Sequence, residues 1–276
     1  SGGGKLEKEL INIQNIPAKK KFRESFGVEE GYSVVTIDLS GAEVVVMADK
    51  ANDTKLFELA MKGDIHSHMS QTGWRNIYQY RANRCERFVD GKVTIEYVEN
   101  QKLASGFIVS KTVNNESHRK PGKNLTFGSI YGCHAKKAGR TLNISRDEGQ
   151  IYIDTIKKEV PLTFRMVQKN VDFALGKGYL ILNNRTNSRV WFPKVINSMR
   201  NKTSLDFMDK IEVDGQARNI PISGSQADML KESMVVIRKY IKENNIDSVL
   251  LAQVHDELVY KIHDSLLSWF PDKIKE

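Results

Sequence analysis

The chain has few cysteines, no long apolar run and no excess of negative charge. Its two cysteines, Cys85 and Cys133, form no CxxC pair and lack zinc-site spacing, so we expect reduced thiols in a cytosol-like compartment. No apolar stretch is long enough to cross a bilayer, and no signal peptide is visible. The sequence therefore predicts no membrane partner and a cytoplasmic location.

Positive charge is what the composition has in surplus. The net charge is +8 and the pI is about 9.3. Such a surplus favours a polyanionic partner, because nucleic acid releases counterions when a basic protein binds it. An ordinary basic surface gives the same number, so charge alone leaves both interpretations open. The 276 residues, of which 40% are hydrophobic, suffice for one large or two small domains.

Apolar patterning predicts a mixture of helices and strands without internal repeats. Strands are expected at 33–38, on both sides of Asn183-Asn184, after the Asp90-Gly91 turn, at 248–254 and directly after the turn at 255–257. Helices are expected at 43–61, 64–80, 119–131, 146–176 with a break at Pro161, and 226–244. The polar stretch 200–217 is predicted to be loop-like. The last two strands should pair antiparallel, which favours an α+β fold.

A ladder of two cations and two aromatic rings lies in the segment RKPGKNLTFGSIYG. Its members are four residues apart and share one face of a helix: Arg119, Lys123, Phe127 and Tyr131. Cations followed by rings suit a ligand with an anionic part and a flat part, such as a nucleoside triphosphate. A helix that buries a core stripe has the same spacing, so the segment alone leaves two interpretations.

Two acids stand at strand ends. Asp38 ends one apolar strand, and Asp256 lies in the turn between two others. Carboxylates so placed can converge on Mg²⁺, which prefers oxygen ligands and binds substrate phosphates. Two such ions could activate a primer hydroxyl and stabilise a leaving pyrophosphate. A capping acid and a polar hairpin tip are the alternatives, but the ladder between the two acids favours the metal site.

These segments resemble the polymerase domain of family A DNA polymerases, the group of bacterial DNA polymerase I and its phage relatives. Three motifs occur in the family's order: DLSGAE from Asp38 resembles motif A, the ladder segment resembles motif B, and QVHDE from Gln253 resembles motif C. INIQNIP from Ile11, DIH from Asp64 and ARNIPISGSQAD from Ala217 are similar to further family segments. The resemblance covers nearly the whole chain.

The resemblance implies a right-hand polymerase fold of α+β class. Its palm would be an antiparallel sheet with helices, its fingers helical, and its thumb largely absent. We expect palm at 1–62 and 176–276 and fingers at 63–175, with an insertion at about 81–111. We also expect a segment of a larger polymerase from a split bacteriophage gene, with thumb and exonuclease segments as partners in the host cytoplasm.

The resemblance also implies a chemistry for named residues. Asp38 and Asp256, with the carbonyl of Leu39, would hold two Mg²⁺ ions, with Mn²⁺ as an alternative. Lys123 would be the general acid for pyrophosphate. The residues implied to bind the dNTP are Glu43, His66, Arg119, Lys123, Phe127 and Tyr131. Among these, Glu43 would be the steric gate that crowds a ribose 2′-hydroxyl.

Contacts to primer-template DNA follow from the same resemblance. The implied residues are Asn12, Gln14, Arg185, Asn219, Gln253 and His255. The implied enzyme is a DNA-directed DNA polymerase, a nucleotidyltransferase of DNA replication. The alternative is a non-catalytic nucleic-acid-binding fragment of a split polymerase that needs its missing parts for activity. Net charge supports that alternative, and the intact acids argue against it.

Overall fold

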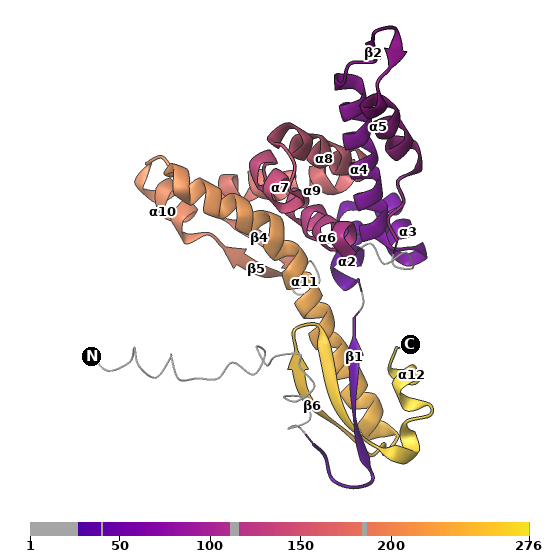
Figure 1. The fold of residues 1–276 in the computed structure, drawn as a ribbon. Coiled ribbons are helices and arrows are strands. Elements are labelled where there is room, and N and C mark those ends of the chain that lie inside the picture. The colour runs from indigo at the N-terminus through magenta and orange to yellow at the C-terminus, as the bar shows by residue number, and fades with distance from the viewer. Residues whose placement is uncertain (1–26, 40, 111–115, 184–186, 276) are drawn as a thin grey trace, which may run out of the picture. The chain divides into compact units, whose positions relative to one another are not determined.

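A computed structural model describes residues 27–39, 41–110, 116–183 and 187–275 of the chain (Figure 1). The chain divides into two units, one formed by Ser1–Ser40 with Ala227–Glu276 and the other by Gly41–Gln226. One of the two boundaries between them along the chain falls within the long helix α11 (Phe207–Glu243). Both units combine helices with small antiparallel sheets, which confirms the predicted α+β class.

The first unit contains a three-stranded antiparallel sheet with the strand order β1-β7-β6. Its elements are β1 (Tyr32–Asp38), β6 (Ser248–Val254), β7 (Glu257–His263), the short helix α12 (Phe270–Lys275) and the second half of α11. In Figure 1 the indigo strand β1 lies in one sheet with the yellow strands of the C-terminal part. The predicted strands at 33–38, at 248–254 and after the turn are confirmed.

One face of this sheet forms the core of the first unit. Every second residue of β7 is buried, and these side chains pack with apolar residues of α11 and α12: Leu258, Tyr260, Ile262, Leu230, Ile237 and Phe270. Because side chains alternate along a strand, burial of one face fixes the register of the pairing. That register places Asp38 opposite Glu257 at one end of the sheet and Tyr32 opposite His263 at the other.

The second unit is mostly helical. Its helices are α2 (Ala42–Ala51), α3 (Thr54–Lys62), α4 (Ile65–Arg84), α5 (Ile95–Gly106), α6 (Glu116–Ile130), α7 (Ala135–Leu142), α8 (Arg146–Glu159), α9 (Pro161–Lys177), α10 (Pro193–Asn201) and the first half of α11. Two hairpins complete it: β2 (Phe88–Val89) with β3 (Lys92–Val93), and β4 (Tyr179–Asn183) with β5 (Ser188–Trp191). Among the described helices, none combines the length and apolar character that crossing a bilayer requires.

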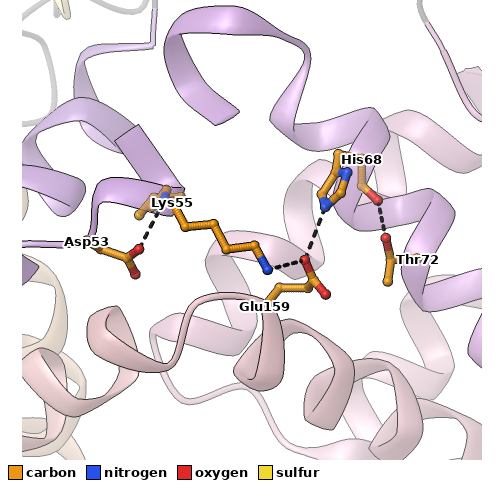
Figure 2. A network of polar contacts seen from close by, with 6 residues as sticks. Asp53, Lys55, His68, Thr72 and Glu159 are labelled. Carbon is orange, nitrogen blue, oxygen red and sulfur yellow. Dashed lines mark hydrogen bonds and ion pairs between the residues drawn. The ribbon is translucent and has the colours of Figure 1, made fainter. Parts of the chain in front are cut away.

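Polar contacts join helices of the second unit around Glu159, the last residue of α8 (Figure 2). Its carboxylate accepts a hydrogen bond from Lys55 Nζ over 2.9 Å and lies 3.1 Å from His68 Nε2. In the same view, buried Asp53 caps α3 by accepting from the backbone N–H of Leu56 over 3.0 Å. His68 thus contributes to packing between helices.

The helix expected at 43–61 is divided into α2 and α3, and the expectations for 200–217 and for the strand after Asp90-Gly91 were also wrong. The stretch 200–217 is not a loop beyond Phe207, where α11 begins. Asp206 accepts a hydrogen bond from the backbone N–H of Asp209 over 2.8 Å, and Val213 is buried against β4 and α9, so tertiary packing outweighs the polar composition. The strand expected after Asp90-Gly91 ends at Val93, because the next residue, Thr94, caps α5.

Close packing of α6 against α4 depends on Gly122. A Cβ on Gly122 would lie 2.5 Å from the Cβ of Ser70, so the two helices could not keep their distance. Pro121 precedes it inside α6. Gly122 therefore fixes where the helix that bears the ladder lies within the second unit.

Gly122→Ala is expected to destabilise the protein by about 1–3 kcal/mol, because overpacking forces neighbouring helices to shift. Gly176→Ala is the matched control, since Gly176 lies in α9 and a Cβ there meets nothing within 4 Å. That change should stabilise the protein by roughly 0.5–1 kcal/mol through the helix preference of alanine. Denaturant unfolding of both variants measures the difference, and equal stabilities would contradict the packing argument.

Candidate active site

Two acidic residues lie at the same end of the sheet in the first unit. Asp38 is the last residue of β1, and Asp256 lies in the turn between β6 and β7. The backbone N–H of Leu39 donates to the backbone oxygen of Asp256 over 3.4 Å, and Asp38 pairs with Glu257. The side chain of Asp38 is exposed and that of Asp256 is half-buried. The structure brings together the two acids that the sequence singled out.

The turn that holds Asp256 has an unusual backbone. His255 adopts φ 55°, in the left-handed region, which costs a non-glycine residue on the order of 1–2 kcal/mol. Its carbonyl accepts a hydrogen bond from the Gln253 side chain over 3.2 Å. A left-handed residue of this kind closes the two-residue turn between β6 and β7. Gln253 and His255, the two predicted DNA contacts of this hairpin, therefore lie near Asp256 in the chain.

The donor atoms at this end of the sheet suit a divalent ion. The carboxylates of Asp38 and Asp256 and the carbonyl of Leu39 are hard oxygen ligands of the kind that Mg²⁺ prefers. Within residues 27–39, 41–110, 116–183 and 187–275, no three side chains of His, Cys, Asp or Glu gather as a metal site. An ion held here would complete its coordination with water or substrate phosphate, as Mg²⁺ usually does.

The predicted ladder lies in the second unit, along α6 and just beyond its end. The rings of Phe127 and Tyr131 are nearly parallel, with centroids 6.4 Å apart and planes 14° from each other. The ring of His66, on the first turn of α4, lies 5.3 Å from that of Phe127. Lys123 is exposed, while both aromatic side chains are partly buried. The spacing by four correctly predicted a shared face, and part of that face also packs against the core.

Arg119, the first member of the ladder, is held by an acid that the sequence argument gave no role. Its Nε and a terminal nitrogen donate to the two carboxylate oxygens of Asp64 over 2.5 and 2.8 Å. Ser67 also donates to Asp64 over 2.5 Å. Burial raises the pKa of Asp64, but the donors outweigh it and hold that pKa well below its usual range. The sequence contained an indication of a role for Asp64, because Asp64 begins the family-like segment DIH that also contains the predicted nucleotide contact His66.

Tyr131 and Glu43 form a second contact within the candidate site. The Tyr131 hydroxyl donates to Oε1 of Glu43, in the first turn of α2, over 2.5 Å. Burial, and then the hydrogen bond to Glu43, raise the pKa of Tyr131 far above its ordinary value. Tyr131 is therefore a neutral donor near pH 7. It anchors the carboxylate that the resemblance assigns to the steric gate.

Other predicted contacts are more scattered. Asn219 is exposed on α11. Asn12, Gln14 and Arg185 lie outside the described residues. The expected insertion contains the end of α4, the hairpin of β2 and β3, and all of α5. The structure thus gathers the nucleotide set in the second unit and the acid set in the first.

Comparison with known proteins gives a consistent result. The family described as DNA polymerase family A matches residues 101–276. DNA polymerase I of Pseudomonas aeruginosa is 26% identical over 268 residues, covering 96% of this chain and 25% of the relative. DNA polymerase I of Bacillus caldotenax is 28% identical over 261 residues, covering 93% of this chain and 25% of the relative. The chain thus spans about a quarter of the length of these relatives.

A solved structure has the same fold. It is described as the POL domain of Pol1 from M. smegmatis in complex with DNA primer-template and dNTP. Its TM-score is 0.70 at 24% sequence identity, and the likeness covers 95% of this chain and 40% of that one. The expected likeness to a polymerase domain of the Pol I type is confirmed for the fold. The relatives are bacterial, and they give the predicted phage source no support.

Proposed function

This chain belongs to DNA polymerase family A, and we propose that it adds dNTPs to the 3′-hydroxyl of a primer under the direction of a template. The observation that supports this most is the meeting of Asp38 and Asp256 at one end of an antiparallel sheet. Residues 1–62 and 176–276 would be palm, and 63–175 would be fingers. The partners are primer-template DNA, a dNTP, and the thumb and exonuclease segments of a complete polymerase.

The cofactor in this proposal is a pair of Mg²⁺ ions, with Mn²⁺ as an alternative. Asp38, Asp256 and the carbonyl of Leu39 would hold them, because these are the oxygen donors at that end of the sheet. When bound, such ions lower the pKa of the primer hydroxyl and neutralise the charge of the leaving pyrophosphate. The ladder supplies the groups that bind and orient the nucleotide.

The side chains of the ladder, with His66 and Glu43, divide the tasks of the proposed reaction. Arg119 and Lys123, with His66, bind triphosphate oxygens by charge-assisted hydrogen bonds. Lys123, exposed on α6, also donates a proton to pyrophosphate as it leaves. Phe127 stacks near the base and sugar, and Tyr131 packs beside the template position. Glu43, anchored by Tyr131, excludes a ribose 2′-hydroxyl.

Primer-template DNA would be contacted through the hairpin of motif C and through further polar side chains. Gln253 and His255 lie beside the acids and are proposed to contact the primer end. The remaining proposed contacts are Asn12, Gln14, Arg185 and Asn219. Phosphate contacts of this kind position the strand without selecting its sequence.

Extension of a labelled primer on a template, with dNTPs and Mg²⁺, tests the proposed function. The chain is assayed alone and with any flanking polymerase segments supplied. Template-directed incorporation is the expected result. Salt-dependent DNA binding without incorporation under every condition would favour the non-catalytic nucleic-acid-binding fragment instead.

Arg119→Ala is expected to raise the KM for dNTP by roughly 10- to 100-fold, the effect of losing charge-assisted hydrogen bonds to phosphate. Asp64 accepts hydrogen bonds from the guanidinium nitrogens of Arg119 that would otherwise be available to the triphosphate. Asp64→Asn should therefore lower the KM, since Arg119 loses a competing partner. Steady-state kinetics with one dNTP measures both changes.

Lys120→Ala is the matched control for Arg119→Ala. Lys120 is an exposed cation on the same helix, one residue away from the ladder face. Lys120→Ala removes one positive charge, as Arg119→Ala does. It should leave the KM for dNTP within about twofold of that of the unchanged protein, since surface charges away from the site contribute little. A similar rise in KM for both variants would mean that general electrostatics, and not Arg119, binds the triphosphate.

A further inference from the structure

The hairpin of β4 and β5 has one face in the core and one face in solvent. Its inward residues, Leu180 and Val190, pack with apolar residues of α9, α10 and α11. Its outward residues are paired across the strands, Tyr179 with Trp191 and Ile181 with Arg189. Because side chains alternate along a strand, these four stand on the same outer surface.

Aromatic rings and one cation gather on that outer surface. The ring centroids of Tyr179 and Trp191 are 5.2 Å apart, and Phe173 of α9 meets Tyr179 edge-on at 5.5 Å. The guanidinium carbon of Arg189 lies 4.9 Å from the centre of the Tyr179 ring. We call Phe173, Tyr179, Arg189 and Trp191 the stacking face.

Trp191 is the most informative member of the stacking face. It is 55% exposed, whereas Trp74 in the same unit is 7% exposed and lies within a cluster of rings. A large ring that stays in water after folding contributes little to the core and remains available to a flat ligand. Beside it, the structure gives Arg189 no carboxylate partner among the described residues, and its guanidinium donates to Asn187 Oδ1 over 3.3 Å.

We propose that the stacking face binds an unpaired base of single-stranded DNA. The base would lie against Trp191, and Arg189 would bind an adjoining phosphate. Aromatic rings combined with cations are how proteins bind single strands without sequence preference, because every base has a flat face. A duplex hides its base faces, and a net charge of +8 favours a polyanion over a protein partner. The inference rests on the proposed function, in which an unpaired template strand is present.

Binding of a labelled single-stranded oligonucleotide of thymidylates, followed by fluorescence anisotropy at fixed salt, tests this inference. Trp191→Ala should weaken binding roughly 5- to 100-fold, the range for loss of one stacked base. Trp191→Phe keeps a ring and should retain most of the affinity. Arg189→Ala should weaken binding and reduce its salt dependence. Binding of a blunt duplex should stay the same in Trp191→Ala.

Trp269→Ala is the matched control, because Trp269 is 42% exposed in the other unit and contacts Phe270. It should bind the oligonucleotide as the unchanged protein does. Three results would each overturn the inference. Trp191→Ala could bind the single strand as tightly as the unchanged protein, or it could lose affinity for single strand and duplex equally. Trp191→Phe could bind the single strand as weakly as Trp191→Ala. The inference would also be overturned if Trp191→Ala weakened only the association with another polypeptide segment and not the binding of the single strand.

The inference and the proposed function can fail separately. Asp38→Asn should abolish extension but keep single-strand binding that depends on Trp191. If the unchanged protein binds single strands through Trp191 but never extends a primer, the proposed function fails alone. If it extends primers while Trp191→Ala has no effect on single-strand binding, the inference fails alone.

Discussion

Replacing Asp38 or Asp256 by asparagine is expected to reduce the rate of primer extension by a factor of about 10³ or more, at least the loss seen when one preorganised electrostatic group is removed. Asparagine keeps the size of the side chain and removes the negative charge that would hold a divalent ion. Both residues lie at one end of the same sheet, so either substitution affects the same proposed site for two Mg²⁺ ions. Single-turnover extension across a Mg²⁺ titration measures the effect.

Asp264→Asn is the matched control for these two variants. Asp264 is an exposed acid near the opposite end of the sheet, where it accepts a hydrogen bond from the Ser33 hydroxyl over 2.7 Å. The rate of primer extension by the Asp264→Asn variant should stay close to that of the unchanged protein. If Asp38→Asn extends primers normally, the metal assignment is wrong. If Asp264→Asn lowers the rate of extension as much as Asp38→Asn does, the lower rate results from damage to the sheet and not from loss of a bound ion.

Glu43→Ala is expected to raise the use of ribonucleotides relative to deoxyribonucleotides by about 100-fold, the discrimination that a pocket achieves against one added hydroxyl. The carboxylate lies in the first turn of α2 and is fixed by the Tyr131 hydroxyl over 2.5 Å. A fixed acid rejects a 2′-hydroxyl by occupying the space that the hydroxyl would need. The ratio of kcat/KM for rNTP and dNTP of the same base measures this.

Two further variants separate the gate from general effects on α2. Tyr131→Phe keeps the ring but removes the donor to Glu43, so it should relax the discrimination partly. Asp49→Ala removes an exposed acid from the same helix and should leave the ratio unchanged. An unchanged ratio in Glu43→Ala would remove Glu43 from the gate. An equal change in Asp49→Ala would show that charge on α2, and not a clash, controls the choice of sugar.

Local pattern was enough to predict much of the fold. Apolar runs bounded by turns predicted β1, β6 and β7, and the break at Pro161 correctly separated α8 from α9. These features depend on neighbours within a few residues, through side-chain period and backbone hydrogen bonds. The start of α11 was missed because the burial of Val213, which depends on segments far away in the chain, decides it.

The sequence by itself determined the order of the motifs and the spacing that places four ladder residues on one helical face. It also determined that the two acids stand at strand ends. Only the tertiary structure decided the partners of these side chains. Asp64 holds Arg119 across 55 positions, Glu43 anchors Tyr131 across 88, and Trp191 stays exposed beside Tyr179. Such contacts follow from how whole helices and strands pack, and no local period in the sequence encodes that packing.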